Sequence, residues 1–123
     1  MAFGARCQVV AARPACVDLR LYAGDTFSVL ITIRYRGTLE PVELTGTWTA
    51  QVRRAPGAPD IVTSFAVDIV DAAAGQLRLS LTPEQTRLLA GREFWWDLQQ
   101  VDGDVVRTWL AGDVAAVMDV TRV

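Results

Sequence analysis

The sequence predicts an all-β protein, built as an antiparallel β-sandwich with one short helix at about residues 82–90. Short segments in which apolar and polar residues alternate recur at intervals of roughly 8–12 residues, and most of them end at Gly, Pro or Asp turns. β-branched residues are common within these segments, as is typical of strands. No regular succession of strands and helices suggests a parallel sheet.

Four strands are predicted in the first half of the chain. Alternate side chains of a strand lie on the same face, so each of these segments has one apolar face that can join a core. The predicted strands are residues 16–24, 26–37, 47–54 and 62–70, with inward faces formed by Val17, Leu19 and Leu21, by Phe27, Val29, Ile31 and Ile33, by Trp48, Ala50 and Val52, and by Phe65, Val67 and Ile69.

Four more strands are predicted in the second half. The turn DGD joins the second and third of them into a hairpin. The predicted strands are residues 75–81, 93–101, 105–111 and 113–120, with inward faces that include Leu77, Leu79 and Leu81 in the first and Val114, Ala116, Met118 and Val120 in the last.

The helix is predicted from its terminal residues. Thr82 is suited to the N-cap, and Gln85 stands where a capping box requires Glu or Gln. Gly91 is expected to cap the C-terminus. A helix of about two turns is marginal by itself, so we expect Leu88 and Leu89 to pack on the sheets.

Three of the four tryptophans lie within residues 93–112. Alternation assigns Trp96 to the core and Trp95 to the outer face, where Trp109 of the partner strand could stack against it. Three interpretations stay open: a hairpin pair half covered by a neighbouring strand, a protein interface, or a sugar-stacking platform. We therefore take Trp95 and Trp109 as candidate interface residues.

Residues 1–15 are predicted to form an N-terminal arm, and residues 16–123 a single sandwich domain. The arm lacks strand alternation and has too little apolar surface to order itself. It could add as a strand to the sheet edge of a neighbouring subunit, with Arg6 and Arg13 pairing with acidic groups there, or it could fold back on its own sandwich.

Cys7 and Cys16 are the two cysteines of the chain. They could close a small loop in an oxidising compartment. We expect instead two unreactive thiols near the terminus. Two thiolates without histidine are too few ligands for structural zinc.

The composition argues against catalysis and against nucleic acid. There is no histidine, and all twelve basic residues are arginine, so neither a Ser-His-Asp triad nor a lysine Schiff base can form. A net charge of −2 leaves no broad basic surface. We expect no enzyme activity, no catalytic residue, no metal, no cofactor, and neither nucleic acid nor membrane among the partners. The carboxylates available to a glycosidase-like pair are Asp68, Asp71, Asp97, Asp102 and Asp104, most of which belong to predicted turns.

Several segments of the chain resemble segments of a known protein family. The matching segments are residues 17–27 (VDLRLYAGDTF), 42–46 (VELTG), 50–53 (AQVR), 81–86 (LTPEQT), 96–99 (WDLQ) and 106–112 (VRTWLAG). Together they are similar to the N-terminal immunoglobulin-like domain of phage baseplate upper proteins, over about residues 17–120. The resemblance implies an immunoglobulin-like sandwich and supplies no catalytic residue. No receptor-binding region follows the domain, so we expect a small stand-alone subunit.

The resemblance implies a non-enzymatic structural subunit of a tailed-phage virion. We expect a tail or baseplate (minor tail) protein that docks in multiple copies on a major virion protein, with other virion proteins and copies of itself as partners. One alternative is a capsid decoration protein or a protein associated with the head–tail connector. The other is a carbohydrate-binding module that contacts host cell-wall glycans through Trp95 and Trp109.

Overall fold

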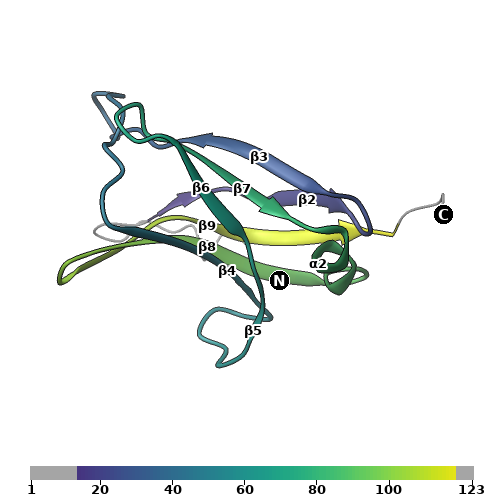
Figure 1. The fold of residues 1–123 in the computed structure, drawn as a ribbon. Coiled ribbons are helices and arrows are strands. Elements are labelled where there is room, and N and C mark those ends of the chain that lie inside the picture. Colours follow the sequence, from purple (N-terminus) through teal and green to yellow (C-terminus); the bar gives the residue numbers. More distant parts are fainter. Residues whose placement is uncertain (1–13, 119–123) are drawn as a thin grey trace.

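A computed structural model describes residues 14–118 and confirms the all-β sandwich (Figure 1). Its elements are β1 (Ala15–Cys16), β2 (Leu19–Tyr22), β3 (Phe27–Thr32), β4 (Thr47–Arg53), β5 (Ile61–Ser64), β6 (Ala66–Asp71), β7 (Gln76–Leu81), α2 (Pro83–Leu88), β8 (Glu93–Asp102) and β9 (Val105–Val117). The larger sheet has the strand order β1-β9-β8-β4-β5, with β2 also paired to β9, and the smaller has the order β3-β7-β6. The immunoglobulin-like assignment stays a prediction.

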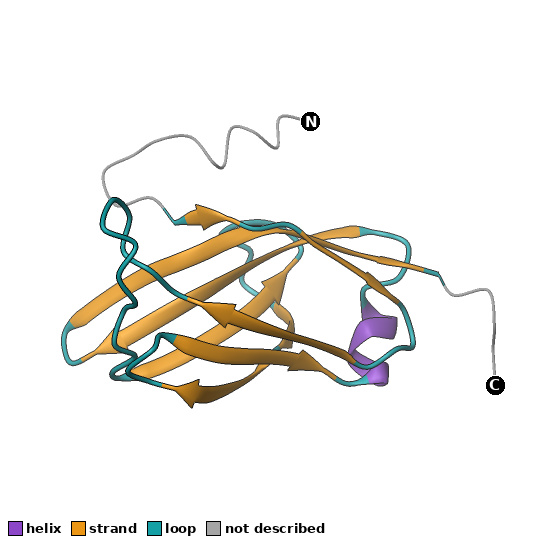
Figure 2. Ribbon diagram, turned by 90° about the horizontal axis from the view of Figure 1, so that it is seen from above, coloured by secondary structure: helices purple, strands orange, loops and turns teal. Residues whose placement is uncertain are grey.

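The first two strands pair in parallel with the C-terminal strand β9, whereas the other strand pairs are antiparallel. Figure 2 shows this arrangement from above. Between β1 and β2 the chain turns toward β9, and a Cβ added at Gly112 would lie 2.0 Å from the carbonyl oxygen of Val17. That oxygen accepts a hydrogen bond of 2.8 Å from the indole nitrogen of Trp96. The close approach therefore requires glycine on β9.

Two predicted strand boundaries are wrong. The predicted strand 62–70 is two strands in different sheets, because the chain crosses from β5, which pairs with β4, to β6, which pairs with β7. Phe65 at the crossing is buried, and its backbone nitrogen donates to the carbonyl of Ala50. Conversely, the predicted strands 105–111 and 113–120 are one continuous strand, β9, up to Val117. Its register with β8 shifts by one residue between Leu98 and Gln99, which makes Trp109 the extra residue of a β-bulge.

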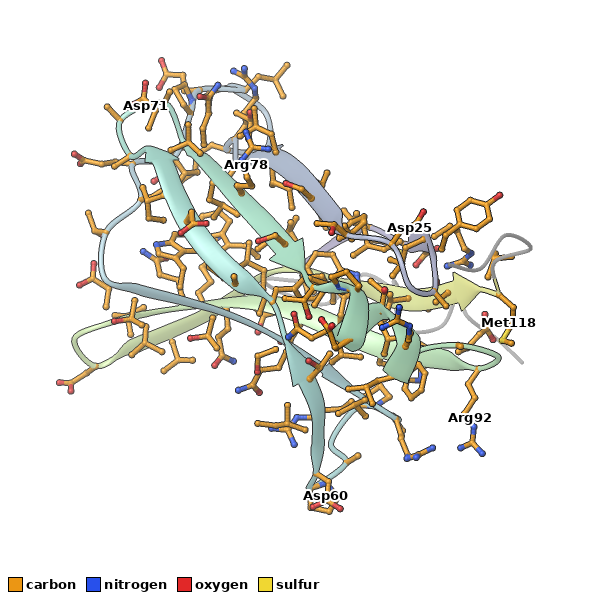
Figure 3. All side chains as sticks on the ribbon, turned by 45° about the vertical axis from the view of Figure 1, so that its right-hand side comes forward. Asp25, Asp60, Asp71, Arg78, Arg92 and Met118 are labelled. Carbon is orange, nitrogen blue, oxygen red and sulfur yellow. The ribbon has the colours of Figure 1, made fainter. Side chains whose placement is uncertain are left out.

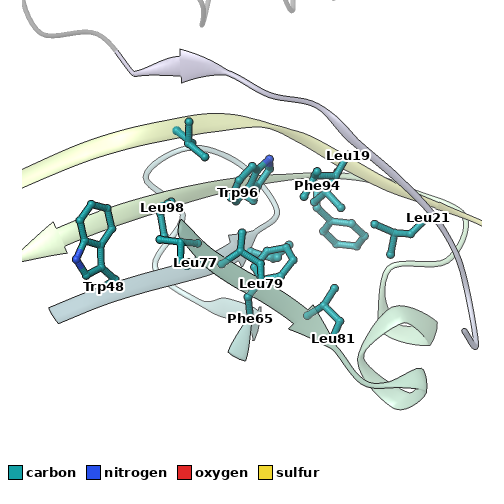
Figure 4. Close-up of a cluster of buried hydrophobic side chains, with 14 of the residues drawn as sticks. Leu19, Leu21, Trp48, Phe65, Leu77, Leu79, Leu81, Phe94, Trp96 and Leu98 are labelled. Atoms are coloured by element: carbon teal, nitrogen blue, oxygen red, sulfur yellow. The ribbon is translucent and has the colours of Figure 1, made fainter. Parts of the chain in front are cut away.

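The core lies between the two sheets, and Figure 4 shows part of it. The alternation in β4, β7 and β8 correctly predicts its centre, since the inward residues of these strands are all buried. Two predicted inward residues are wrong: Ile69, on the edge strand β6, and Met118, beyond the end of β9, are exposed. The buried residues of the three central strands are Trp48, Ala50, Val52, Leu77, Leu79, Leu81, Phe94, Trp96 and Leu98.

Helix α2 closes one end of the sandwich. The predicted capping box is confirmed: the Thr82 hydroxyl accepts from the backbone nitrogen of Gln85, whose side chain accepts from the backbone nitrogen of Thr82. The C-cap is Leu89 rather than Gly91. Leu89 is fully buried as predicted, but Leu88 is exposed, because the short helix presents one face to the sheets.

Cys16 is disulfide-bonded, so the expectation of two free thiols is wrong for this residue. The other cysteine of the chain, Cys7, lies outside the described residues. The disulfide bond of Cys16 therefore constrains β1 of the larger sheet covalently.

Candidate functional site

The predicted site residues do not form one site. Arg6 and Arg13 lie outside the described residues. Trp95 is in register with Arg53 of β4 and Asp113 of β9, on the outer face of the larger sheet. Trp109 lies on the inner side of the sheet, because the bulge turns it toward the sandwich interior. The predicted cross-strand stack of Trp95 on Trp109 is therefore wrong, and so is a sugar-stacking platform shared by the two rings.

Trp109 is the centre of an aromatic cluster. Its ring stacks on that of Trp48, with centroids 6.2 Å apart and an interplanar angle of 29°, and meets the ring of Tyr35 edge-on at 6.2 Å. Its indole nitrogen donates to Oε1 of Gln100 over 2.9 Å. The guanidinium of Arg107 lies 3.9 Å from the ring centroid, a cation–π arrangement. These contacts fix the position of the Trp109 ring, and the neighbouring side chains of Tyr35 and Arg107 are exposed to solvent.

Around this cluster is a hollow of about 270 Å³ between the end of β3 and the bulge of β9. We call its exposed part the arginine–aromatic surface, formed by Arg34, Tyr35, Arg36, Arg107 and Trp109. The turn after Tyr35 is held by a hydrogen bond of 3.1 Å from the Arg34 guanidinium to the carbonyl of Leu39.

Leu39 itself is strained. Its φ is +61°, a left-handed conformation that is uncommon for a residue with a Cβ. Its side chain is nevertheless 65 % exposed, so burial in the core does not account for the strain. Backbone strain of this kind is typical of turns that hold functional side chains in place.

A second hollow, of about 380 Å³, lies on the outer face of the larger sheet, and we call it the Trp95 cavity. Its polar floor is formed by Gln51 and Arg53 of β4 and by Trp95, Asp97 and Gln99 of β8. Residues 55–57 of the loop between β4 and β5 form one wall, and Figure 3 shows this loop projecting from the sandwich near Asp60. On the opposite side of the hollow, the small residues Ala111 and Gly112 of β9 leave space.

The carboxyl of Asp97 has a pKa above its ordinary value. Partial burial in the cavity raises the pKa of its carboxyl, because the charged form loses hydration, and the nearby Arg53 guanidinium lowers it by a smaller amount. Burial dominates. Asp97 has no hydrogen bond within the described part of the chain.

Replacing Asp97 with Asn is expected to stabilise the protein at pH 7 by less than about 1 kcal/mol, since the group is partly solvated. The folded carboxyl holds its proton to higher pH than the unfolded one, which titrates near ~3.9. The free energy of unfolding therefore falls as pH rises from about 4 through the folded pKa, and the variant lacks this fall. Thermal unfolding from pH 3.5 to 8 measures it, with Asp68→Asn on exposed β6 as control. If the stability of wild type and of Asp97→Asn depended on pH in the same way, the raised pKa of Asp97 would be contradicted.

Among residues 14–118, neither of the two hollows brings together the carboxylates considered for catalysis. Asp97 is the acidic residue that lines the Trp95 cavity. Asp68 and Asp71 lie on β6 in the other sheet, and Asp102 at the hairpin tip accepts a hydrogen bond of 2.6 Å from Thr45. Within residues 14–118 no group of three or more acidic, Cys or His side chains could hold a metal ion.

The chain matches no protein-family model and no curated protein. Over the described range, no helix has the length and apolar character needed to cross a membrane.

The sequence did not indicate most residues of the arginine–aromatic surface or of the Trp95 cavity. The run Arg34-Tyr35-Arg36 was a usable signal, because an aromatic between two arginines is typical of contact surfaces. Its meeting with Arg107 depends on the packing of the segment after β3 against β9 and has no local sequence signal. Gln51 and Arg53 could have been placed beside Trp95 and Asp97 if the pairing of β4 with β8 had been inferred.

Proposed function

We propose that the protein is a non-enzymatic structural subunit of a tailed-phage virion, most simply a tail or baseplate subunit, which docks on a major virion protein through the arginine–aromatic surface. The composition of that surface carries the proposal. Trp, Tyr and Arg are the residues most enriched in the energetically important centres of protein interfaces. Here Tyr35, Trp109 and three arginines gather at one end of a chain whose net charge is −2.

The partner surface is expected to be acidic. Arg34, Arg36 and Arg107 have no carboxylate within salt-bridge distance among the described residues, so their charges are available to a partner. The neighbouring hairpin tip exposes Val101, Val105 and Val106, which add apolar area. A partner surface with an acidic patch and an apolar rim would match both the arginines and the valines.

The family resemblance supports the virion setting, and the strand order supports an immunoglobulin-like sandwich. If β3 to β9 are taken as strands B, C, C′, D, E, F and G, the smaller sheet is B-E-D and the larger is G-F-C-C′. A capsid decoration protein or a connector-associated protein would use the same surface. Separating virions into heads and tails, and probing each fraction with an antibody against the protein, distinguishes these alternatives from a tail subunit. Absence of the protein from purified virions would refute the proposal.

Reversing the charges of Arg36 and Arg107 to Glu is expected to reduce incorporation into virions at least about tenfold, because like charges would face the acidic partner. Both residues are exposed, so the fold should be kept. The matched control is Arg87→Glu with Arg92→Glu, the same charge change at the helix end of the sandwich, where Figure 3 labels Arg92. Equal incorporation of both double variants would place the docking surface elsewhere.

A further inference from the structure

The free edge of β3 is the least protected strand edge in the described part of the chain. The larger sheet ends at β1 and β2 on one side and at β5 on the other, and the smaller sheet ends at β3 and β6 (Figure 1). Proteins keep such edges from pairing with other chains by short length, charge and bulges. Strands β1, β2 and β5 have no more than four residues each, and β6 carries two aspartates and a bulge. The six residues of β3 are uncharged and pair with β7 in an unbroken register.

At this edge, every second residue presents its backbone groups outward. Ile33 follows β3, and its backbone nitrogen donates to the carbonyl of Gly75 over 2.8 Å, which fixes the direction of the alternation. The odd-numbered residues of β3 therefore bond to β7, and the N–H and C=O groups of Ser28, Leu30 and Thr32 face the open edge. Within residues 14–118 these groups have no hydrogen-bond partner. They are available to another strand.

The side chains of β3 suit a second copy of the same strand. An antiparallel pair with its two-fold axis at Leu30 places the two Leu30 side chains opposite each other and Ser28 opposite Thr32. Each of these pairs exchanges two backbone hydrogen bonds, so the register uses all the open groups of both strands. On the outer face it joins two leucines that are 45 % exposed in the single chain. On the inner face Val29 lies opposite Ile31, a pair of β-branched residues that stabilises sheets.

The charges at the two ends of β3 are complementary in the same register. Asp25 precedes the strand and Arg34 follows it, and both residues are exposed. An antiparallel pair brings Arg34 of each copy beside Thr26 and Asp25 of the other copy, because the strand ends are exchanged. Among the described residues the Asp25 carboxylate has no ion pair of its own. A parallel pair would instead bring like charges together, so the charges favour the antiparallel arrangement.

We infer that two copies of the protein associate through β3, in antiparallel register about Leu30, so that their smaller sheets form one continuous sheet. The partner strand covers the exposed leucine and bonds the open backbone groups, which accounts for an edge without protection. One strand pair buries less area than the about 1,600 Å² of a standard protein interface. The dimer is therefore weak, and it forms where copies are concentrated.

The test uses the full chain in sedimentation equilibrium up to millimolar concentration, where a concentration-dependent dimer is expected. Leu30→Lys should raise its dissociation constant about tenfold or more, because two ammonium groups would meet at the axis. The matched control is Val70→Lys, a similar change at an exposed position of the other edge strand, β6, and it should dimerise as the wild type does. Asp25→Arg should weaken the dimer about fivefold, and the double variant Asp25→Arg with Arg34→Asp should restore it, because the ion pair re-forms with its signs reversed.

Amide hydrogen exchange locates the contact within the dimer. The amides of Ser28, Leu30 and Thr32 should exchange more slowly at high protein concentration than at low concentration, whereas those of β6 should keep their rates. The alternate amides of β3 are bonded to β7 and should be protected at every concentration. This pattern distinguishes pairing at β3 from association through any other surface.

Three outcomes would overturn the inference: the protein stays monomeric at millimolar concentration, the three edge amides exchange equally fast in the dimer, or Leu30→Lys and Val70→Lys weaken the dimer equally. Protection of these amides in purified virions, but not in the concentrated protein, would assign the edge to a strand of another protein and overturn self-pairing. The inference does not rest on the docking function. The double variant Arg36→Glu with Arg107→Glu should still dimerise even where virion incorporation is lost, so failure of one proposal leaves the other standing.

Discussion

Replacing Trp96 with alanine is expected to lower the free energy of unfolding by about 4 kcal/mol, equivalent to a fall in Tm of about 15 °C for a chain of this size. The side chain is buried, and its ring meets that of Phe65 edge-on with centroids 5.5 Å apart. Alanine would leave a cavity between the sheets. It would also leave the partly buried carbonyl of Val17 without its indole donor.

Two companion variants separate these contributions. Trp96→Phe keeps most of the ring packing and loses the hydrogen bond, so it should cost about 1–2 kcal/mol. Trp95→Ala changes the adjacent residue on the outer face and should cost clearly less than Trp96→Ala. Chemical denaturation of the three variants measures the differences. Equal losses for Trp95→Ala and Trp96→Ala would contradict the assignment of the two rings to opposite faces.

Replacing Gly112 with alanine is expected to cost about 3 kcal/mol, because the new Cβ would lie 2.0 Å from the oxygen and 2.6 Å from the carbon of the Val17 carbonyl. Both are backbone atoms, so no flexible side chain can move aside. The connection between β1 and β2 must shift, and the hydrogen bond to Trp96 would be lost with it.

The control for this variant is Gly103→Ala at the tip of the β8–β9 hairpin. Gly103 has a φ of +61° and no atom within 4 Å of its added Cβ, so alanine should cost about 1 kcal/mol through backbone conformation alone. Urea unfolding gives both values, and indole fluorescence reports the environment of Trp96. If Gly112→Ala were no less stable than Gly103→Ala, the backbone at Val17 would have to be free to move.

The parts of the fold that depend on local pattern were predictable from the sequence. Alternation placed Trp48, Leu79 and Trp96 in the core correctly, because one face of each strand must be apolar when a second sheet covers it. Thr82 and Gln85 identified the start of the helix, since the capping box satisfies its own backbone groups.

The remaining features depend on contacts between distant segments. The bulge at Trp109 follows from how β9 pairs with β8, and it moved this ring from the predicted outer face to the inner side. The change of sheet at Phe65 has no Gly or Pro to mark it. Both candidate surfaces likewise combine residues from separate strands, so the sequence could indicate Trp95 and Trp109 but not their neighbours.

The parallel pairing of β2 with β9 constrains the order in which the protein can fold. Leu19 pairs with Val114, so β2 has its partner in β9, which follows every other strand of the two sheets, and β8 also pairs along β9. During synthesis on the ribosome, β2 waits without this partner until β9 has emerged. Closing so long a loop is slow, and the exposed strand edges are prone to wrong pairing in the meantime. Folding of this sandwich is therefore completed after translation of β9, in one late and cooperative step.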